Sequence, residues 1–194
     1  MDVYDETYEN YKLYVNPTLA RVMKLSGSPV EVRAQGCTIW DQHDKPYFDF
    51  AGGYGVFTLG HRHPKVVAAV KAQLDLMALS GKTMFNVTLG RASKRLAELA
   101  PGDLQISFFC NSGTEAVEGA IKLARAATKR RRIVATRDAF HGKTLGSLSA
   151  IGREYFKDAY APLLEDVAHL EYGSTAGLEE ALRDAAAFIV EPVQ

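Results

Sequence analysis

The sequence is poor in cysteine and has no long apolar run. It contains two cysteines, Cys37 and Cys110, which lie far apart and outside any C-x-x-C pair. This usage argues against a disulfide framework and a zinc site, and it favours a reduced, cytoplasmic protein. No apolar stretch approaches the roughly 20 residues that span a bilayer, and the acidic, polar amino terminus is unlike a signal peptide. We therefore expect a cytoplasmic protein with no membrane partner and no metal site.

Neither sign of charge is in excess. Lys plus Arg and Asp plus Glu each number 23, so the formal net charge is zero. Proteins that hold nucleic acid through bulk charge are basic, so we expect no nucleic-acid partner. The composition that remains, 47% hydrophobic and 24% charged, is ordinary for a globular protein.

Short β-type runs come first in the chain, and alternating helices and strands follow. Residues 30–33, 37–41 and 47–50 are rich in strand-forming residues and are separated by turn-forming ones, which predicts a small antiparallel β-meander. The later pattern predicts helices at 64–77, 91–100, 114–128 and 178–184, and strands at 106–110, 133–136 and 186–190. We expect the run at 106–110 to be a buried parallel strand. Alternation of this kind predicts an α/β fold with a mostly parallel sheet flanked by helices.

The segment Asn111-Ser112-Gly113-Thr114-Glu115-Ala116 lies between a predicted strand and a predicted helix. Gly113 permits close approach of a ligand, and a helix start offers unpaired amides and a positive dipole end. A phosphate cradle is one interpretation. A capping box, with Ser112 as N-cap and Glu115 three residues on, is the other. Both can hold, because capping does not use every free donor.

Three further segments carry polar or aromatic side chains near predicted strand ends or in loops. Phe140-His141-Gly142-Lys143-Thr144 offers a ring that can stack on a flat ligand, or simply a packed phenylalanine with a loop histidine. Glu191-Pro192-Val193-Gln194 follows a predicted strand, so it is either a site wall or a strand-ending turn. The glycine-rich segment 52–55, followed by Gly60-His61-Arg62-His63-Pro64, indicates a flexible loop before a helix.

Taken in order and at these intervals, five segments resemble the class III aminotransferases, which are pyridoxal-phosphate enzymes of fold type I. The resemblance covers nearly the whole chain, from Val15-Asn16-Pro17 to its end. Its most specific stretches lie at 59–64, 109–116, 122–125, 139–144 and 190–194.

The resemblance implies the fold type I α/β architecture, with residues 1–60 as part of the small domain and 61–194 as the first part of the large cofactor-binding domain. It implies that pyridoxal 5′-phosphate is the cofactor and that the reaction transfers an amino group from an amine or amino acid to a keto acid. A homodimer is implied as well, because sites in this family lie at a dimer interface.

The same resemblance implies roles for particular residues. Ser112, Gly113 and Thr114 match the loop that holds the cofactor phosphate, and Phe140, with His141 beside it, matches the ring that stacks on the pyridine. Glu191 and Gln194 match the wall near the cofactor. Tyr54 matches a residue that shapes the substrate pocket, and Gly53 and Thr58 are weaker members of the same loop.

The chain departs from the family pattern in one respect. The aspartate that faces the ring nitrogen and the Schiff-base lysine both follow the Glu-Pro-Val-Gln segment in the family, and nothing follows it here. Lys143 does not match the lysine position. We therefore expect an incomplete fragment that does not transaminate alone.

Two alternatives stay open at this point. One is a non-catalytic truncated relative that binds a phosphate ligand or a partner, and the downstream reading frame distinguishes it from a partial sequence. The other is an unrelated phosphate-binding α/β domain, which the absence of a G-x-G-x-x-G motif disfavours. Within the family, Tyr54-Gly55-Val56-Phe57 and Phe108-Phe109-Cys110 resemble the diamine, ornithine and acetylornithine group.

Overall fold

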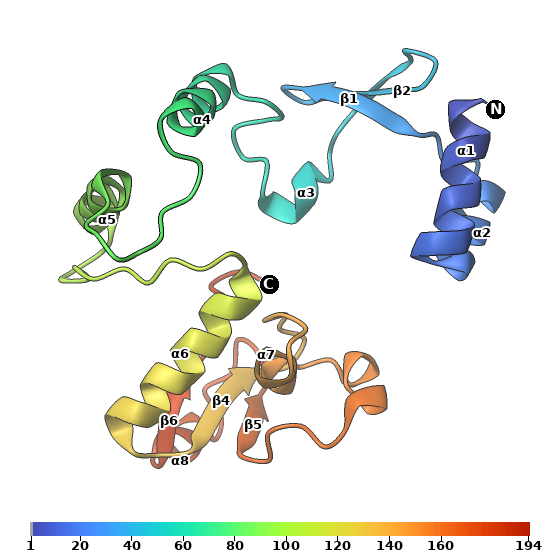
Figure 1. Ribbon diagram of the computed structural model, residues 1–194. Coiled ribbons are helices and arrows are strands. Elements are labelled where there is room, and N and C mark those ends of the chain that lie inside the picture. Colours follow the sequence, from blue (N-terminus) through green and yellow to red (C-terminus); the bar gives the residue numbers. More distant parts are fainter. Residues whose placement is uncertain (1) are drawn as a thin grey trace. The chain divides into compact units, whose positions relative to one another are not determined.

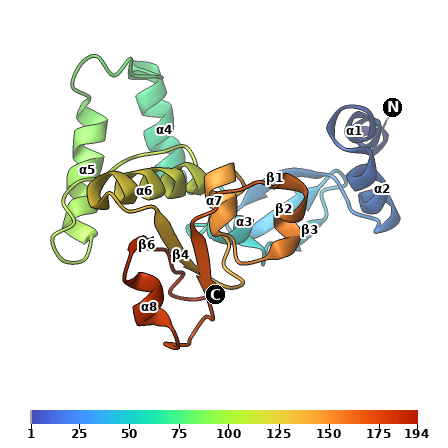
Figure 2. The same cartoon turned by 90° about the horizontal axis from the view of Figure 1, so that it is seen from below.

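A computed structural model describes residues 2–194. The chain forms two compact units that divide between Asn86 and Val87, and each is described by itself. Figures 1 and 2 show the elements of both units. No helix of the described part has the length and apolar composition that crossing a membrane requires.

The first unit begins with helices and continues with a small antiparallel sheet. Its helices are α1 (Val3–Asn10), the π-helix η1 (Tyr11–Val15), α2 (Pro17–Leu25), α3 (Gly52–Gly55) and α4 (Pro64–Leu76). Its strands are β1 (Glu31–Gln35), β2 (Thr38–Asp41) and β3 (Pro46–Phe48), which pair antiparallel in the order β1-β2-β3. The predicted β-meander is therefore confirmed.

Helix α2 begins at Pro17 for a clear local reason. Asn16 leaves the helical conformation, and its side-chain oxygen accepts a hydrogen bond from the Leu19 amide at 3.0 Å. Pro17 then occupies the first turn of α2, where its missing N–H costs nothing. Pro64 likewise occupies the first turn of α4, although its N-cap residue His63 makes no side-chain capping bond.

The second unit holds a parallel sheet. Its helices are α5 (Val87–Leu99), α6 (Gly113–Thr128), α7 (Leu145–Ala150), the 3₁₀ turns η2 (Glu154–Phe156) and η3 (Asp158–Tyr160), and α8 (Leu178–Leu182). Its strands are β4 (Arg132–Thr136), β5 (Val167–Leu170) and β6 (Ala185–Phe188), ordered β5-β4-β6 and all parallel. The α/β class with a parallel sheet flanked by helices is confirmed.

The apolar core of the second unit surrounds β4. Ile133, Val134 and Ala135 of this central strand are fully buried, as are Ala150 and Ile151 at the end of α7. A continuous apolar run is what a parallel strand covered on both faces requires. Helix α6 packs against β6 and α7 (Figure 1), so its first turn lies near the segment that leads into α7.

The prediction of a strand at 106–110 is wrong. This segment has no strand assignment, and Ile106 and Phe108 are 97% and 80% exposed. Among residues 2–194 no neighbouring strand pairs with it, and an apolar run becomes a strand only where its backbone N–H and C=O groups find partners. Strand β5, in contrast, was not predicted: its half-buried Val167–Leu170 segment contains a histidine and is too short for a clear pattern.

Candidate functional site

The first turn of α6 has two unused hydrogen-bond donors. Ser112 is the N-cap, and its hydroxyl oxygen accepts from the Glu115 amide at 3.3 Å. Glu115 reaches back to the Asn111 amide at 2.7 Å, one residue earlier than in a regular capping box. In residues 2–194 the amides of Gly113 and Thr114 donate no hydrogen bond. Capping and a set of free donors therefore coexist at this turn.

The segment 140–144, called the 140–144 loop below, lies directly against the turn 112–114. The hydroxyl oxygens of Thr114 and Thr144 are 2.8 Å apart, and those of Thr114 and Ser147 are 2.6 Å apart. Gly142 has a φ of 123°, and a Cβ added there would lie 2.3 Å from the Thr114 hydroxyl oxygen. Only glycine permits this approach, which explains the glycine of the His-Gly-Lys-Thr motif.

Phe140 presents a partly exposed ring on this loop. The residue is 45% exposed, and its ring meets that of Phe156 edge to face with the centroids 5.8 Å apart. The Lys143 ammonium group lies 5.9 Å from the centroid of the Phe140 ring. The Phe140 amide donates to Glu191 Oε1 at 3.2 Å, so a carboxylate from the far end of the chain fixes the loop backbone.

His141 is a buried imidazole with an unused nitrogen. The residue is 9% exposed, and its Nε2 atom has no hydrogen-bond partner among the described residues. Burial lowers the pKa of His141 below its ordinary value, although the nearby Glu191 carboxylate acts in the opposite direction. A neutral imidazole with one free nitrogen is able to accept or donate a single hydrogen bond.

Gln194 is held at the carboxyl end of β4. Its side-chain amide donates to the Thr136 hydroxyl at 3.2 Å and to the Arg137 carbonyl at 3.0 Å. Because ligands of open α/β sheets gather beyond the carboxyl ends of the strands, this position suits a site residue. Seven of the residues expected from sequence thus lie in the second unit, and contacts join their segments: Ser112, Gly113, Thr114, Phe140, His141, Glu191 and Gln194.

Gly53 and Tyr54 lie in the first unit, in a glycine-rich turn with an unusual backbone. Residues 52–55 all have positive φ, and the φ of Tyr54 is 56°. This conformation suits glycine but costs a side-chain-bearing residue about 1–2 kcal/mol. Tyr54 is nevertheless fully exposed, so no packing of its side chain offsets the strain.

The loop that carries Tyr54 is closed at its base by Asp49 and His61. Asp49 Oδ2 and His61 Nε2 are 2.8 Å apart, and Asp49 Oδ1 accepts from the Ala51 and Gly52 amides. The hydrogen bond from Gly52, followed by that from His61, holds the pKa of Asp49 below its ordinary value. His61 also pairs with Gly36 through two backbone hydrogen bonds. The Gly-His-Arg-His-Pro motif, expected to be flexible, is thus anchored at His61.

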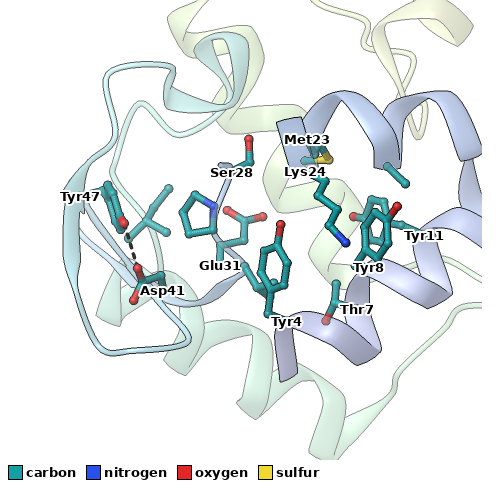
Figure 3. Close-up of a pocket in the computed structure, with 14 residues that line it drawn as sticks. Tyr4, Thr7, Tyr8, Tyr11, Met23, Lys24, Ser28, Glu31, Asp41 and Tyr47 are labelled. Atoms are coloured by element: carbon teal, nitrogen blue, oxygen red, sulfur yellow. Dashed lines mark hydrogen bonds between the residues drawn. The ribbon is translucent and has the colours of Figure 1, made fainter. Parts of the chain in front are cut away.

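A separate cavity of about 540 Å³ in the first unit contains none of the expected site residues. Figure 3 shows tyrosines from α1, η1 and β3 around it, together with Lys24, whose ammonium group lies 4.2 Å from the centroid of the Tyr8 ring. Tyr47 donates to Asp41 at 2.9 Å at its edge. Its lining carries no unpartnered buried polar group among the described residues, so it offers no comparable chemistry.

Sequence reasoning missed two residues that organise the site in the second unit, Glu118 and Ser147. Glu118 accepts hydrogen bonds from Thr144 and from two amides of α7, and the buried Ser147 contacts Thr114. One signal was available: Glu118 follows Thr114 by four residues, so both lie on the same helix face. The contact with Thr144 and Ser147 depends on the packing of α6 against α7, which has no local sequence signature.

Comparisons with known proteins identify a family that matches most of the chain. The profile of the family described as aminotransferase class-III matches residues 26–194. The chain is 43% identical over 164 residues to an acetylornithine aminotransferase of Methanopyrus kandleri, covering 84% of this chain and 42% of that protein. It is 39% identical over 205 residues to a putrescine aminotransferase of Pectobacterium atrosepticum, covering 97% and 44%.

A solved structure gives the same picture. An (S)-enantioselective omega-transaminase from Thermomicrobium roseum superposes with a TM-score of 0.87 at 27% identity, covering 100% of this chain and 50% of that one. The chain therefore spans a little under half the length of the curated relatives that it matches, and half of this solved structure.

Proposed function

The chain belongs to the class III aminotransferase family, and from this premise we propose that it serves pyridoxal-phosphate-dependent transfer of an amino group from an amine or amino acid to a keto acid. The observation that carries the proposal is the junction of the turn 112–114 with the 140–144 loop. It brings free amides and an accessible aromatic ring together, which are the two features that a phosphorylated pyridine requires.

The donor set fits such a group. Within residues 2–194 the amides of Gly113 and Thr114 and the hydroxyl of Ser112 donate no hydrogen bond, and they lie at the positive end of a 16-residue helix. Phe140 offers a ring face, and His141 offers a buried nitrogen without a partner. When bound, pyridoxal phosphate supplies an electron sink for the carbon that loses its proton.

The chain's own residues would hold and orient this group. Gly113 and Thr114 would donate to the phosphate through their amides, and Phe140 would stack on the ring. His141 would hydrogen-bond a polar atom beside it. Glu191 would keep the Phe140 backbone in place, and Gln194 would form the adjacent wall at the end of β4.

We also propose the finer assignments that the family suggests. Residues 1–60 would belong to the small domain and 61–194 to the large domain, and Tyr54 and Gly53 would shape the substrate pocket. The protein would be a cytoplasmic homodimer. The acetylornithine and putrescine relatives point to a diamine, or a diamino acid with one nitrogen acylated, as the donor.

The test uses the protein expressed from its complete reading frame. It is loaded with pyridoxal phosphate, supplied with ornithine, N-acetylornithine or putrescine and then with 2-oxoglutarate, and glutamate is measured. Glutamate formed only when both donor and acceptor are present supports the proposal. No glutamate with any donor, together with a stop codon directly after Gln194, would favour the non-catalytic relative instead.

Gly113 offers a sharp test of the phosphate site. As the first helical residue it tolerates proline, which removes only the amide hydrogen, and the extended conformation of Ser112 suits a following proline. Gly113→Pro is expected to weaken the binding of pyridoxamine 5′-phosphate about tenfold to a hundredfold, since a hydrogen bond to a charged group contributes about 1.5–3 kcal/mol.

Gly113→Ala is the matched control, because it keeps the amide and its Cβ meets open space. Its affinity should stay within about twofold of the parent protein. Equal affinities for Gly113→Pro and Gly113→Ala would show that the phosphate does not bind at this turn.

A further inference from the structure

We propose that Glu118 is a positioning residue that locks the turn 112–114 to the 140–144 loop through a directed chain of hydroxyl hydrogen bonds. This inference rests on the proposed function, because it concerns how the two halves of the cofactor site are held together. It begins from the groups that surround the Glu118 carboxylate.

One oxygen of Glu118 collects three donors. Oε1 accepts from the Thr144 hydroxyl at 2.5 Å, from the Gly146 amide at 2.9 Å and from the Ser147 amide at 3.1 Å. Thr144 is the N-cap of α7 but makes no side-chain capping bond of its own. The carboxylate of α6 therefore caps α7 from outside, and it satisfies amides that a helix start leaves unpaired.

Gly146 is required for this contact. A Cβ at this position would lie 2.2 Å from a Glu118 carboxylate oxygen, far inside van der Waals contact. The spacing Gly-Lys-Thr-Leu-Gly thus supplies two close approaches, Gly142 against Thr114 and Gly146 against Glu118. Both serve the same junction between α6 and the segment before α7.

The carboxylate also fixes the direction of the hydroxyl hydrogens. An ionised carboxylate only accepts, so Thr144 must give its single hydroxyl hydrogen to Glu118. Thr144 is then an acceptor for Thr114 at 2.8 Å and for Ser147 at 3.0 Å, while the hydroxyl oxygens of Thr114 and Ser147 are 2.6 Å apart. Each hydroxyl has one hydrogen, so Thr114 gives its hydrogen to Thr144 or to Ser147. In either order the chain reaches Glu118 through Thr144.

This direction has a consequence for the cofactor site. The Thr114 hydroxyl hydrogen is committed to Thr144 or to Ser147 and is not free for a phosphate. Thr114 would contribute its backbone amide to the ligand, while its side chain anchors the turn to the 140–144 loop. Donation from a hydroxyl would come from Ser112, whose oxygen accepts from Glu115 and whose hydrogen is uncommitted in the described part of the chain.

The test measures binding rather than turnover. The ligands are pyridoxamine 5′-phosphate, which has no aldehyde to react with surface lysines, and pyridoxamine, which lacks the phosphate. The ratio of their dissociation constants, determined by calorimetry on the protein from its complete reading frame, reports the contribution of the phosphate. A residue that only stabilises the fold would leave this ratio unchanged in the folded protein.

Three variants separate the possibilities. Glu118→Leu removes every acceptor and is expected to lower the ratio about tenfold or more, since displacement of a ligand-binding group by a fraction of an ångström is costly. Glu118→Gln keeps the carbonyl acceptor and should restore the ratio to within about threefold of the parent. Thr144→Val interrupts the chain while leaving the amides of Gly146 and Ser147 bonded, and should lower the ratio as Glu118→Leu does.

Amide hydrogen exchange tests the contact of Glu118 with α7 in the absence of any ligand. The amides of Gly146 and Ser147 should exchange faster in Glu118→Leu but not in Thr144→Val. Should Glu118→Leu fail to fold, Thr144→Val decides the question. An unchanged ratio in folded Glu118→Leu or Thr144→Val would overturn the positioning role. If the parent protein binds pyridoxamine 5′-phosphate and pyridoxamine equally well, the proposed function is contradicted, and this inference fails with it.

Discussion

The backbone amide of Phe140 donates a hydrogen bond to a carboxylate oxygen of Glu191, 3.2 Å away and 51 residues further along the chain. The loop after β4 is thus fastened to the segment after β6, and the two strands are neighbours in the sheet. The sequence motifs at 140–144 and 190–194 are therefore two parts of one structure.

Replacement of Glu191 should loosen this fastening. Glu191→Leu leaves the Phe140 amide without an acceptor and should lower the free energy of unfolding by about 1 kcal/mol, measured by urea denaturation. Amide exchange at Phe140 should become faster. Glu165 is exposed and its side chain makes no hydrogen bond within residues 2–194, so Glu165→Leu is the control and should change stability by less than about 0.5 kcal/mol. Unchanged exchange at Phe140 would contradict the contact.

Stability should fall as the pH falls below about 6.5, the ordinary pKa of histidine. Burial lowers the pKa of His141 and of His169 in the folded protein. Between the lowered and the ordinary values the unfolded chain binds more protons than the folded chain, so unfolding becomes easier as acid is added. Urea unfolding at a series of pH values from 8 to 5 measures this slope.

Two variants locate the source of the pH dependence. His141→Gln removes one of the titrating groups and should flatten the slope. Glu191→Gln keeps a hydrogen-bond acceptor for Phe140 but removes the charge that favours the imidazolium ion, so it should lower the pKa of His141 further, as read by NMR titration. A slope unaffected by His141→Gln would assign the effect to other groups.

The strained turn at Tyr54 predicts an order of stability among substitutions. Tyr54 has a φ of 56° and its side chain is fully exposed, so replacing it removes no packing. Asparagine tolerates the left-handed region and valine does not. Thermal denaturation should therefore rank Tyr54→Asn above the parent by up to about 1 kcal/mol and Tyr54→Val below it by about 1 kcal/mol. A Tyr54→Asn variant that is less stable than the parent would refute the strain. If Tyr54 lines the substrate pocket as proposed, Tyr54→Asn should also raise the KM for the donor.

Two isoleucines test where the core lies. Ile133 in β4 is fully buried, whereas Ile106 is 97% exposed. Ile133→Ala should destabilise the 194-residue chain by about 2–5 kcal/mol through cavity formation, and Ile106→Ala by less than about 0.5 kcal/mol. A similar decrease in the free energy of unfolding for the two variants would indicate that residues 106–110 are buried, as the sequence pattern predicts.

Local features of the chain were open to prediction because their causes are local. Pro17 and Pro64 begin helices since proline has no N–H to lose there. Gly36 turns between β1 and β2 with a positive φ, and the apolar run of β4 is continuous because both its faces are covered. The motif at 111–116 likewise indicated both a cap and free amides, and the structure shows the two together.

What only the tertiary structure decided are the relationships between distant segments. Ile106 and Ile133 stand in similar apolar runs, yet only the run with Ile133 gained strand partners, because a strand is stabilised by neighbours and not by its own residues. Glu118 became part of a hydroxyl chain because α6 packs against α7 and glycine at 146 lets the carboxylate approach. The sequence by itself determined which residue types were present at each turn and helix end. The packing of helix on helix and strand on strand decided which of them meet.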